Sequence, residues 1–221
     1  MKTLALFDLD NTLLIGDSDH AWGKFLAEVG AVDAKTQLEK QDYFYQQYVA
    51  GELDIYEFTE FQFTALKENS LDQLKIWREE YVETHILPLV TQARIDLVDW
   101  HQQQQHETII ITATNSFITE PIAKIFNIEH LIATEPEQNI HGFTGKLTGT
   151  PCFQAGKISR LNDYINNQLS NGLSIKDFDT WFYSDSINDL PLLEIANHPI
   201  AVTPDDKLRQ FSIEQNWKII D

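Results

Sequence analysis

The sequence predicts an α/β protein with a doubly wound, mainly parallel sheet and an inserted helical cap. Short apolar segments alternate along the chain with segments of helical apolar spacing, which is typical of strand–helix–strand units. The apolar segments hold few polar residues, as expected for strands covered on both faces. One long interval, from about residue 18 to about residue 87, has helical spacing and no convincing strand, and it predicts a helical insertion.

Five segments are expected to form strands because each is apolar and bounded by polar residues. They are residues 3–9, "ETIIIT" (107–112), "LIAT" (131–134), "TWFYSD" (180–185) and "HPIAV" (198–202). Helical patterns lie between the later strands, at residues 117–127, 152–169 and 189–197. This alternation indicates a Rossmann-like core.

The strandless interval divides the chain into two predicted domains. The α/β core takes residues 1–16 and 88–221, and the helical cap takes residues 17–87. Helical spacing within the cap is carried by Trp22, Phe25, Leu26 and Val29, and later by Phe58, Phe61 and Leu66. Its aromatic residues are expected to pack as cap core rather than to line a substrate site: Tyr43, Phe44, Tyr45, Phe58, Phe61 and Phe63.

The sequences of three connecting segments predict a local structure for each. The run "HQQQQH" (101–106) predicts an exposed helix end, because glutamines offer no catalytic charge. The segment "NQLSNGLS" (167–174) predicts a loop, and "NIHGFTGKL" (139–147) predicts a hairpin with glycine at its bends.

Composition narrows the possible partners and compartment. The chain has 34 acidic and 16 basic residues and a formal charge of -18, which disfavours binding to nucleic acid. Cys152 is the only cysteine of the chain, so an intramolecular disulfide and a cysteine-based zinc cluster are excluded. No apolar run approaches the roughly 18 residues of a membrane span. We expect a soluble, cytoplasmic protein, whose oligomeric state the sequence leaves open.

Two of the predicted strands end on acidic residues. Asp8 and Asp10 follow the first apolar run, and an extended backbone would point both to the same side. Asp185 ends a later strand, and Asp189 follows where a helix begins. Ligands of open α/β sheets bind at the carboxyl ends of the strands, so these carboxylates are expected to converge. Such a cluster needs a cation, and Mg²⁺ is the natural one because it prefers oxygen ligands.

Simpler interpretations exist for each residue taken alone. Asp10 and Asn11 could form a turn, and Asp189 could cap a helix. A calcium EF-hand is excluded, because Leu13 stands where its loop needs glycine and Ile187 stands where the second site needs an acid. Only the two acidic strand ends together make a site the better interpretation.

These residues resemble the motifs of the haloacid dehalogenase-like superfamily. "DLDNT" (8–12) resembles its first motif, Thr112 and Lys157 match the second and third, and "SDSINDLPLL" (184–193) resembles the fourth. The helical interval falls where phosphoserine phosphatase and its relatives carry a cap. "TGTPCFQAGK" (148–157) further resembles a bacterial subgroup of that branch that includes histidinol-phosphate phosphatases.

The resemblance implies a phosphatase mechanism and a role for each matching residue. Asp8 would attack phosphorus and form an aspartyl phosphate, and Asp10 would act as general acid and then base. Thr112 would donate a hydrogen bond to the phosphoryl group, and Lys157 would offset its charge. The metal ligands implied are Asp8, the backbone carbonyl of Asp10 and Asp185, with Asp189 farther out or acting through water, and with Asn188 near metal and phosphate.

The cap residues bear on the substrate. Asp17 matches a substrate-binding acid of phosphoserine phosphatases, and an ungapped alignment puts Glu60 where those enzymes use arginine. Two acids favour an amine-bearing phosphate ester, with histidinol phosphate preferred over phosphoserine; phosphoethanolamine and phosphocholine are alternatives. Asp19 and His20 are read as a helix-start acid and a half-buried histidine.

Two competing functions share part of this chemistry. A phosphate-accepting signalling module also gathers acids and a lysine around magnesium, but it needs no cap and is usually about half this long. A dehalogenase shares the nucleophile but has no need of the metal-binding acids Asp10, Asp185 and Asp189.

Overall fold

A computed structural model describes residues 2–169 and 172–221. Its centre is a seven-stranded sheet with the order β4-β3-β2-β1-β5-β6-β7, in which every neighbouring pair is parallel except the antiparallel pair β3 and β4. The strands are β1 (Thr3–Phe7), β2 (Glu107–Asn115), β3 (His130–Asn139), β4 (Gly142–Thr148), β5 (Asp179–Ser184), β6 (His198–Val202) and β7 (Lys218–Ile220). The predicted doubly wound, mainly parallel sheet is confirmed.

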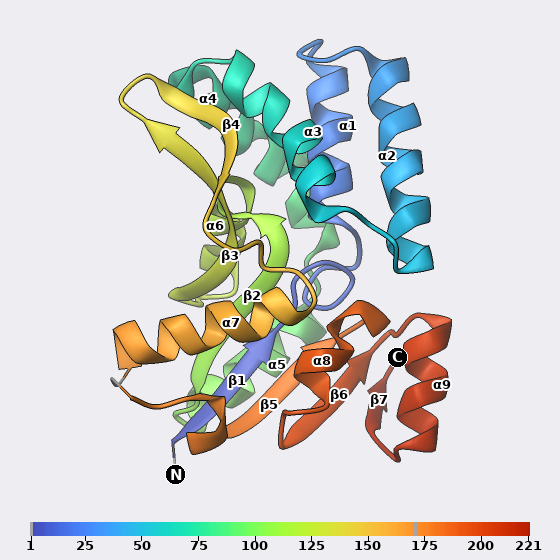
Figure 1. The fold of residues 1–221 in the computed structure, drawn as a ribbon, viewed down its shortest axis with the longest axis vertical. Coiled ribbons are helices and arrows are strands. Elements are labelled where there is room, and N and C mark those ends of the chain that lie inside the picture. The colour runs from blue at the N-terminus through green and yellow to red at the C-terminus, as the bar shows by residue number, and fades with distance from the viewer. Residues whose placement is uncertain (1, 170–171) are drawn as a thin grey trace.

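The helices fall into a group before β2 and a group that alternates with the later strands (Figure 1). The first group is α1 (Ser18–Glu28), α2 (Ala34–Ala50), α3 (Ile55–Glu68), α4 (Leu71–Tyr81) and α5 (Gln92–Gln103). The second is α6 (Ser116–Ile125), α7 (Ala155–Tyr164), α8 (Leu190–Leu193) and α9 (Asp206–Glu214). Short π or 3-10 turns lie at Val82–Ile86, Leu87–Leu89, Ile165–Leu169, Ile175–Asp177 and Ile187–Asp189.

Both faces of the sheet are buried. Leu4 and Leu6 of β1 belong to one apolar cluster, which includes buried residues of α7, α8 and α9. Ala5 and Phe7 point to the opposite face and belong to a second cluster, which includes residues of α5 and α6. This alternation is the period of an extended strand, and it explains why β1 is apolar at every position from Leu4 to Phe7.

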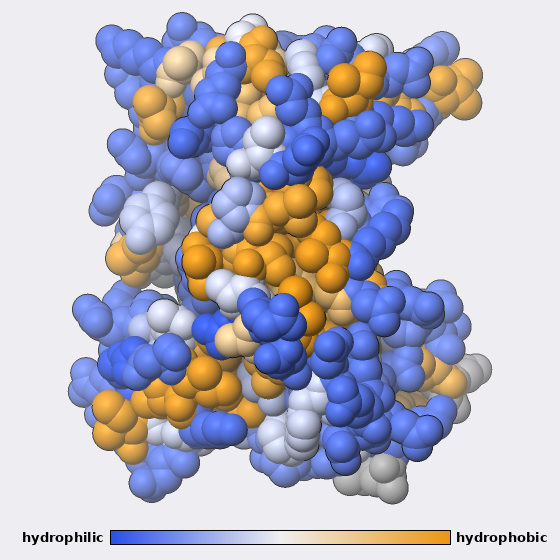
Figure 2. Space-filling model, turned by 180° about the vertical axis from the view of Figure 1, so that it is seen from behind, coloured by the Kyte–Doolittle hydropathy of each residue, from blue (hydrophilic) through white to orange (hydrophobic). Residues whose placement is uncertain are grey.

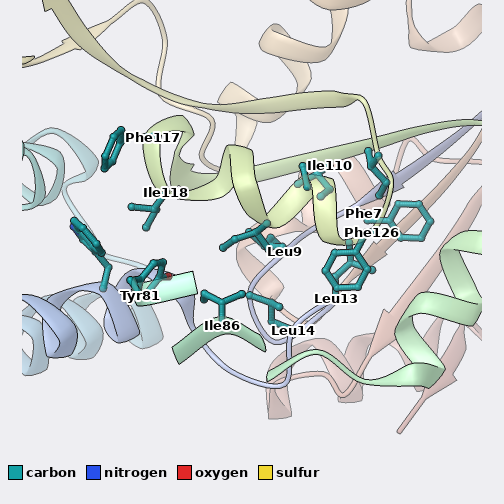
Figure 3. Close-up of a cluster of buried hydrophobic side chains, with 14 of the residues drawn as sticks. Phe7, Leu9, Leu13, Leu14, Tyr81, Ile86, Ile110, Phe117, Ile118 and Phe126 are labelled. Atoms are coloured by element: carbon teal, nitrogen blue, oxygen red, sulfur yellow. The ribbon is translucent and has the colours of Figure 1, made fainter. Parts of the chain in front are cut away.

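The second cluster continues from the sheet into the inserted helices. Figure 3 shows Phe7 and Ile110 of the sheet in one cluster with Phe117 and Ile118 of α6, and with Tyr81 at the end of α4. In Figure 1 helices α1 to α4 lie beyond the carboxyl ends of the strands, beside the hairpin of β3 and β4. The helical nature of residues 18–81 is thus confirmed, whereas the division into core and cap domains stays a prediction.

The surface between these two parts carries exposed apolar side chains. Ile15 and Leu87 are more than two-fifths exposed, and the amide of Ile15 donates to the carbonyl of Leu89 at 2.9 Å. Seen from behind, the molecule has a hydrophobic band between its upper and lower parts, with polar residues above and below (Figure 2). Within the described ranges, no helix is both long and apolar enough to cross a membrane.

Several element boundaries differ from the sequence prediction. β1 ends at Phe7, two residues early, because the chain turns at Asn11, whose φ is 54°. The helix predicted at residues 152–169 begins at Ala155, and the helix predicted at residues 189–197 is shortened to Leu190–Leu193. Residues 167–169 of the predicted loop 167–174 belong to the π-helical turn Ile165–Leu169, and residues 170 and 171 lie outside the described residues. α9 and β7 were not expected.

The other two connecting segments agree with prediction in most respects. β3 and β4 form the expected hairpin, with positive φ at Gly142 and Gly145. α5 ends in the glutamine run, and residues 103–105 are exposed. His101, however, is fully buried and lies 2.8 Å from the hydroxyl of Tyr183, so the start of that run belongs to the core.

Candidate active site

The predicted acidic strand ends do lie together. β2, β1 and β5 are adjacent in the sheet; Asp8 and Asp185 directly follow β1 and β5, and Thr112 lies within β2, three residues before its end. All three line one pocket between the sheet and the inserted helices. The sheet-side lining of this pocket includes the other core residues expected from sequence: Asp10, Lys157, Asn188 and Asp189.

Lys157 joins two of these carboxylates. Its Nζ lies 2.7 Å from Oδ1 of Asp8 and 2.6 Å from Oδ2 of Asp189, and the residue is 2% exposed. Ser184 Oγ also donates to Oδ2 of Asp189, at 2.7 Å. Burial by itself would lower the pKa of Lys157, but the charges of Asp189 and Asp8 raise it well above its usual value. The lysine is therefore held as a buried cation between two acids.

A glycine allows this placement of Lys157 at the start of α7. A Cβ on Gly156 would lie 2.2 Å from the backbone oxygen of Pro151, which is closer than real contacts allow. Gln154, the residue before α7, has a φ of 47°, and its Nε2 donates to Oδ1 of Asn188 at 3.3 Å. The chain thus approaches its own backbone tightly just before the lysine.

Asp10 is held by two donors, both missed in the sequence analysis. The amide of Ser18 donates to its Oδ1 at 2.6 Å, and Thr114 Oγ1 donates to its Oδ2 at 2.7 Å. Burial, and then the charge of Asp17, raise the pKa of Asp10 to about 6. Thr114 lies two residues after Thr112 in β2, and side chains two residues apart in a strand point to the same face. This period could have predicted that Thr114 lies beside Thr112.

Burial and neighbouring carboxylates raise the pKa values of Asp8 and Asp185. Burial raises the pKa of Asp8 to about 7, with Asp189 and Asp10 adding to the rise and Lys157 opposing it. Burial and then the charge of Asp8 raise the pKa of Asp185 well above its usual value. The metal-free pocket therefore holds more negative charge than it can stabilise, and it favours an added cation.

The inserted helices close the other side of the pocket. They contribute Asp17, Asp19, His20, Gln41, Phe44, Tyr45, Tyr48, Leu53, Ile55, Phe58 and Gln62. Asp17 caps α1, its Oδ1 accepting from the amide of His20 at 2.8 Å. Tyr48 contacts the core, because its hydroxyl donates to Ser186 Oγ at 2.7 Å and its carbonyl accepts from Nδ2 of Asn188 at 3.2 Å.

Two sequence interpretations in the cap need correction. Asp19 is 7% exposed and lines the pocket, so it is more than a helix-start acid, and His20 is exposed rather than half-buried. Of the aromatic residues expected to be cap core, Phe44 and Phe63 are buried as predicted, although Phe44 also lines the pocket, as do Tyr45 and Phe58. The helical pattern marked these residues as amphipathic but not which neighbour each would face.

The structure does not bring Glu60 to the pocket. Glu60 is exposed and borders a separate hollow with Lys40 and Phe61, whereas Gln62 lines the pocket. Two positions along a helix turn the side chain by about 200°, so an alignment error of two residues is enough to reverse its direction. Gln62 had no sequence signal of its own.

The atoms of the pocket that could bind a metal ion are oxygen atoms. Within the described parts of the chain, no three His, Cys, Asp or Glu side chains form a metal-binding group by themselves. The pocket does hold the carboxylates of Asp8 and Asp185, beside the segment that carries the backbone carbonyl of Asp10. Two carboxylates with further oxygen ligands is the donor set of a magnesium site that keeps bound water, and it suits neither zinc nor copper.

Known proteins resemble this chain along its whole length. A histidinol-phosphatase of Neisseria meningitidis serogroup C (strain 8013) is 39% identical over 223 residues, covering 100% of this chain and 99% of the relative. A crystal structure of a protein of unknown function from Bordetella pertussis Tohama I superimposes with a TM-score of 0.93 at 41% identity, covering 100% and 99% of the two chains.

More distant structures share the fold. A phosphoserine phosphatase, solved as an analogue of its phospho-aspartyl intermediate, has a TM-score of 0.68 at 15% identity and is covered over 92% of its length. The model of the haloacid dehalogenase-like hydrolases matches residues 5–194, a range that contains every core residue of the pocket named above. The chain therefore belongs to the haloacid dehalogenase-like hydrolase family.

Proposed function

We propose that this chain is a magnesium-dependent phosphomonoesterase that hydrolyses a small, amine-bearing phosphate ester, with histidinol phosphate the favoured substrate. Family membership and its full-length relative make it a phosphatase. The observation that carries the finer proposal is the pairing of Asp8 with Lys157 at 2.7 Å, in a pocket where Asp10 is held by two donors. Cytoplasmic location is part of the proposal.

The reaction uses Asp8 as the nucleophile. A carboxylate oxygen of Asp8 bonds to phosphorus as the ester P–O bond breaks, and Asp10 gives its proton to the departing alkoxide. Asp10 then takes a proton from the water that attacks phosphorus, which releases phosphate and restores Asp8. A pKa of about 6 for Asp10 suits both proton transfers near neutral pH. Thr112 and Lys157 bind the phosphoryl oxygens.

Asp8, Asp185 and the backbone carbonyl of Asp10 would hold magnesium. Asp189 would stay in the outer shell, which agrees with its Oδ2 being shared by Lys157 and Ser184. Magnesium would neutralise charge on the phosphoryl group and on these carboxylates. Asn188, near the same strand end, would contact metal-bound water or phosphate.

The substrate assignment rests on the cap side of the pocket. Asp17 and Asp19 both line it, and an ammonium or imidazolium group would be attracted to them, whereas the carboxylate of phosphoserine would be repelled. Phosphoserine, phosphoethanolamine and phosphocholine remain the alternative substrates. A signalling module is disfavoured, because the chain belongs to a hydrolase family and its acids lie beneath inserted helices.

Phosphate release should depend on magnesium. We expect the purified protein to hydrolyse p-nitrophenyl phosphate with repeated turnover in millimolar Mg²⁺, and excess EDTA to abolish the activity until Mg²⁺ is restored. The measurement is phosphate released per mole of protein. Full activity in EDTA would contradict the metal assignment. Release of p-nitrophenol that stops at one per chain, with the phosphoryl group retained on the protein, would favour the signalling module.

Magnesium should also stabilise the folded protein. Metal binding to the native state alone adds about 2.7 kcal/mol at a free concentration 100 times the dissociation constant, so the melting temperature should rise with Mg²⁺. Asp185→Ala should flatten this response without lowering metal-free stability, because it removes one of the repelling charges. The measurement is thermal unfolding in EDTA and across a Mg²⁺ titration. A variant that responds as the parent does would remove Asp185 from the ligand set.

A further inference from the structure

We propose that Asp19 and Gln41 form the subsite that selects the leaving group, and that they favour a cationic group carrying several hydrogen-bond donors. This inference rests on the proposed phosphatase function and adds two residues that the sequence analysis did not assign to substrate. We call this pair the acceptor subsite.

Asp19 has one carboxylate oxygen without a partner. Its Oδ2 accepts from Nε2 of Gln62 at 2.6 Å, which fixes the side chain between α1 and α3. Its Oδ1 is buried and has no hydrogen-bond partner, and the residue lines the pocket. A buried carboxylate oxygen without a donor is costly, because the hydration lost on burial is not replaced. A ligand donor in the pocket would replace it.

Gln41 also lines the pocket and has a second buried acceptor without a partner. Its Nε2 donates to the backbone carbonyl of His20 at 3.1 Å, so Oε1 must be the other end of the amide; the reverse orientation would set two oxygens against each other. Oε1 is buried without a partner, and Gln41 is 6% exposed. Glycine at position 23 makes room for this amide, because a Cβ there would lie 2.3 Å from Nε2 of Gln41.

The chemistry of the subsite follows from these two atoms. Of the buried side-chain atoms that lack a partner in the described residues, Asp19 Oδ1 and Gln41 Oε1 are the two whose residues line the pocket, and both accept. The ligand must therefore supply donors, and the charge of Asp19 favours a cationic one. Phe44, Tyr45 and Phe58 line the adjacent wall and suit a flat ring or a cation. An amino-imidazole leaving group has this combination.

The first test compares substrates on matched variants. Asp19→Asn keeps the shape of the side chain and an acceptor for Gln62, but it replaces the charge and presents a donor to the pocket. We expect the ratio of kcat/KM for histidinol phosphate to that for p-nitrophenyl phosphate to fall about ten- to hundred-fold, as for loss of one charge-assisted hydrogen bond. The ratio for phosphoserine should rise.

Glu60→Gln is the matched control, because it removes one acid on the exposed side of α3 and should leave every ratio unchanged. Gln41→Met should lower the histidinol phosphate ratio less than Asp19→Asn does. Asp19→Asn should melt no lower than the parent, because it removes a buried, incompletely paired charge. An equal fall for all three substrates, or an unchanged ratio, would overturn the acceptor subsite.

A second measurement separates this inference from the proposed reaction. Calorimetric titration of the metal-free protein with histidinol, which lacks the phosphate, reports on the subsite without any turnover. Binding at least ten-fold weaker in Asp19→Asn than in the parent and in Glu60→Gln supports the subsite even if no phosphate ester is hydrolysed. Equal binding to all three proteins, or no binding to any, overturns it even if the protein is an active phosphatase.

Discussion

Asp8→Asn should lower kcat by at least about 10⁴-fold, because an amide cannot form the acyl phosphate and only positioning and electrostatic stabilisation would remain. The substitution keeps the size of the side chain, so the pocket should retain its shape. It also removes one of the charges that raise the pKa of Asp185, and Lys157 keeps its 2.6 Å contact with Asp189, so metal-free stability should fall less than it does in Lys157→Met. The variant therefore separates loss of the nucleophile from loss of the fold.

The measurement is single-turnover and steady-state phosphate release, together with acid-quench trapping of labelled phosphoprotein. The parent should yield a labelled chain that hydroxylamine cleaves, as an acyl phosphate requires, and Asp8→Asn should yield none. Asp96→Asn, which changes an exposed acid on α5, is the control for general loss of charge and should behave as the parent does. A loss of less than about 10²-fold, or label retained in Asp8→Asn, would place the nucleophile elsewhere.

The acidic residues at the strand ends could be predicted from the sequence because their positions follow from the geometry of a single strand. The strand period and the position at a sheet edge were enough to expect Asp8, Asp10 and Asp185 in one place. Lys157 is different: it reaches Asp8 across 149 positions of the chain, and only the family resemblance singled it out. Its hydrogen bonds to two carboxylates could not be predicted without the packing of α7 against the strand ends.

The cap was predicted as helical but not at the level of individual side chains. The direction in which a helical side chain points can be predicted only when the helix boundaries are known to within one residue. The alignment placed Glu60 in the pocket, where Gln62 lies, because it was two residues out. Asp19 could not be recognised from sequence either, because its burial depends on Gln62, which lies 43 positions away on another helix. β7 was missed because three residues at a sheet edge carry almost no periodic signal.

Lys157→Met should cost both activity and stability, for one electrostatic reason. Methionine matches the apolar part of lysine but leaves the carboxylates of Asp8 and Asp189 facing each other without the cation they share. Removing one partner of a buried ion pair costs about 3 to 5 kcal/mol, so we expect a loss of that size in the metal-free free energy of unfolding. Loss of the charge that faces the phosphoryl group should lower kcat by about 10²- to 10³-fold.

The same substitution should change the pH dependence in a defined direction. The charge of Lys157 lowers the pKa of Asp8, so its removal should raise that pKa above its value of about 7 in the metal-free protein. A carboxyl group whose pKa is raised by folding stabilises the native state below its unfolded pKa and loses that contribution as pH rises through the folded pKa. Metal-free Lys157→Met should therefore lose stability on going from pH 5 to pH 8 more steeply than the parent.

A second variant distinguishes the charge argument from a simple packing defect. Adding Asp189→Asn to Lys157→Met removes the repulsion between the two acids, so the double variant should recover part of the lost stability in EDTA without recovering kcat. The measurements are chemical unfolding in EDTA at pH 5, 7 and 8, and kcat in saturating Mg²⁺. If the double variant is as unstable as Lys157→Met at every pH, the cost comes from packing alone, and the shared cation is not what stabilises the strand ends.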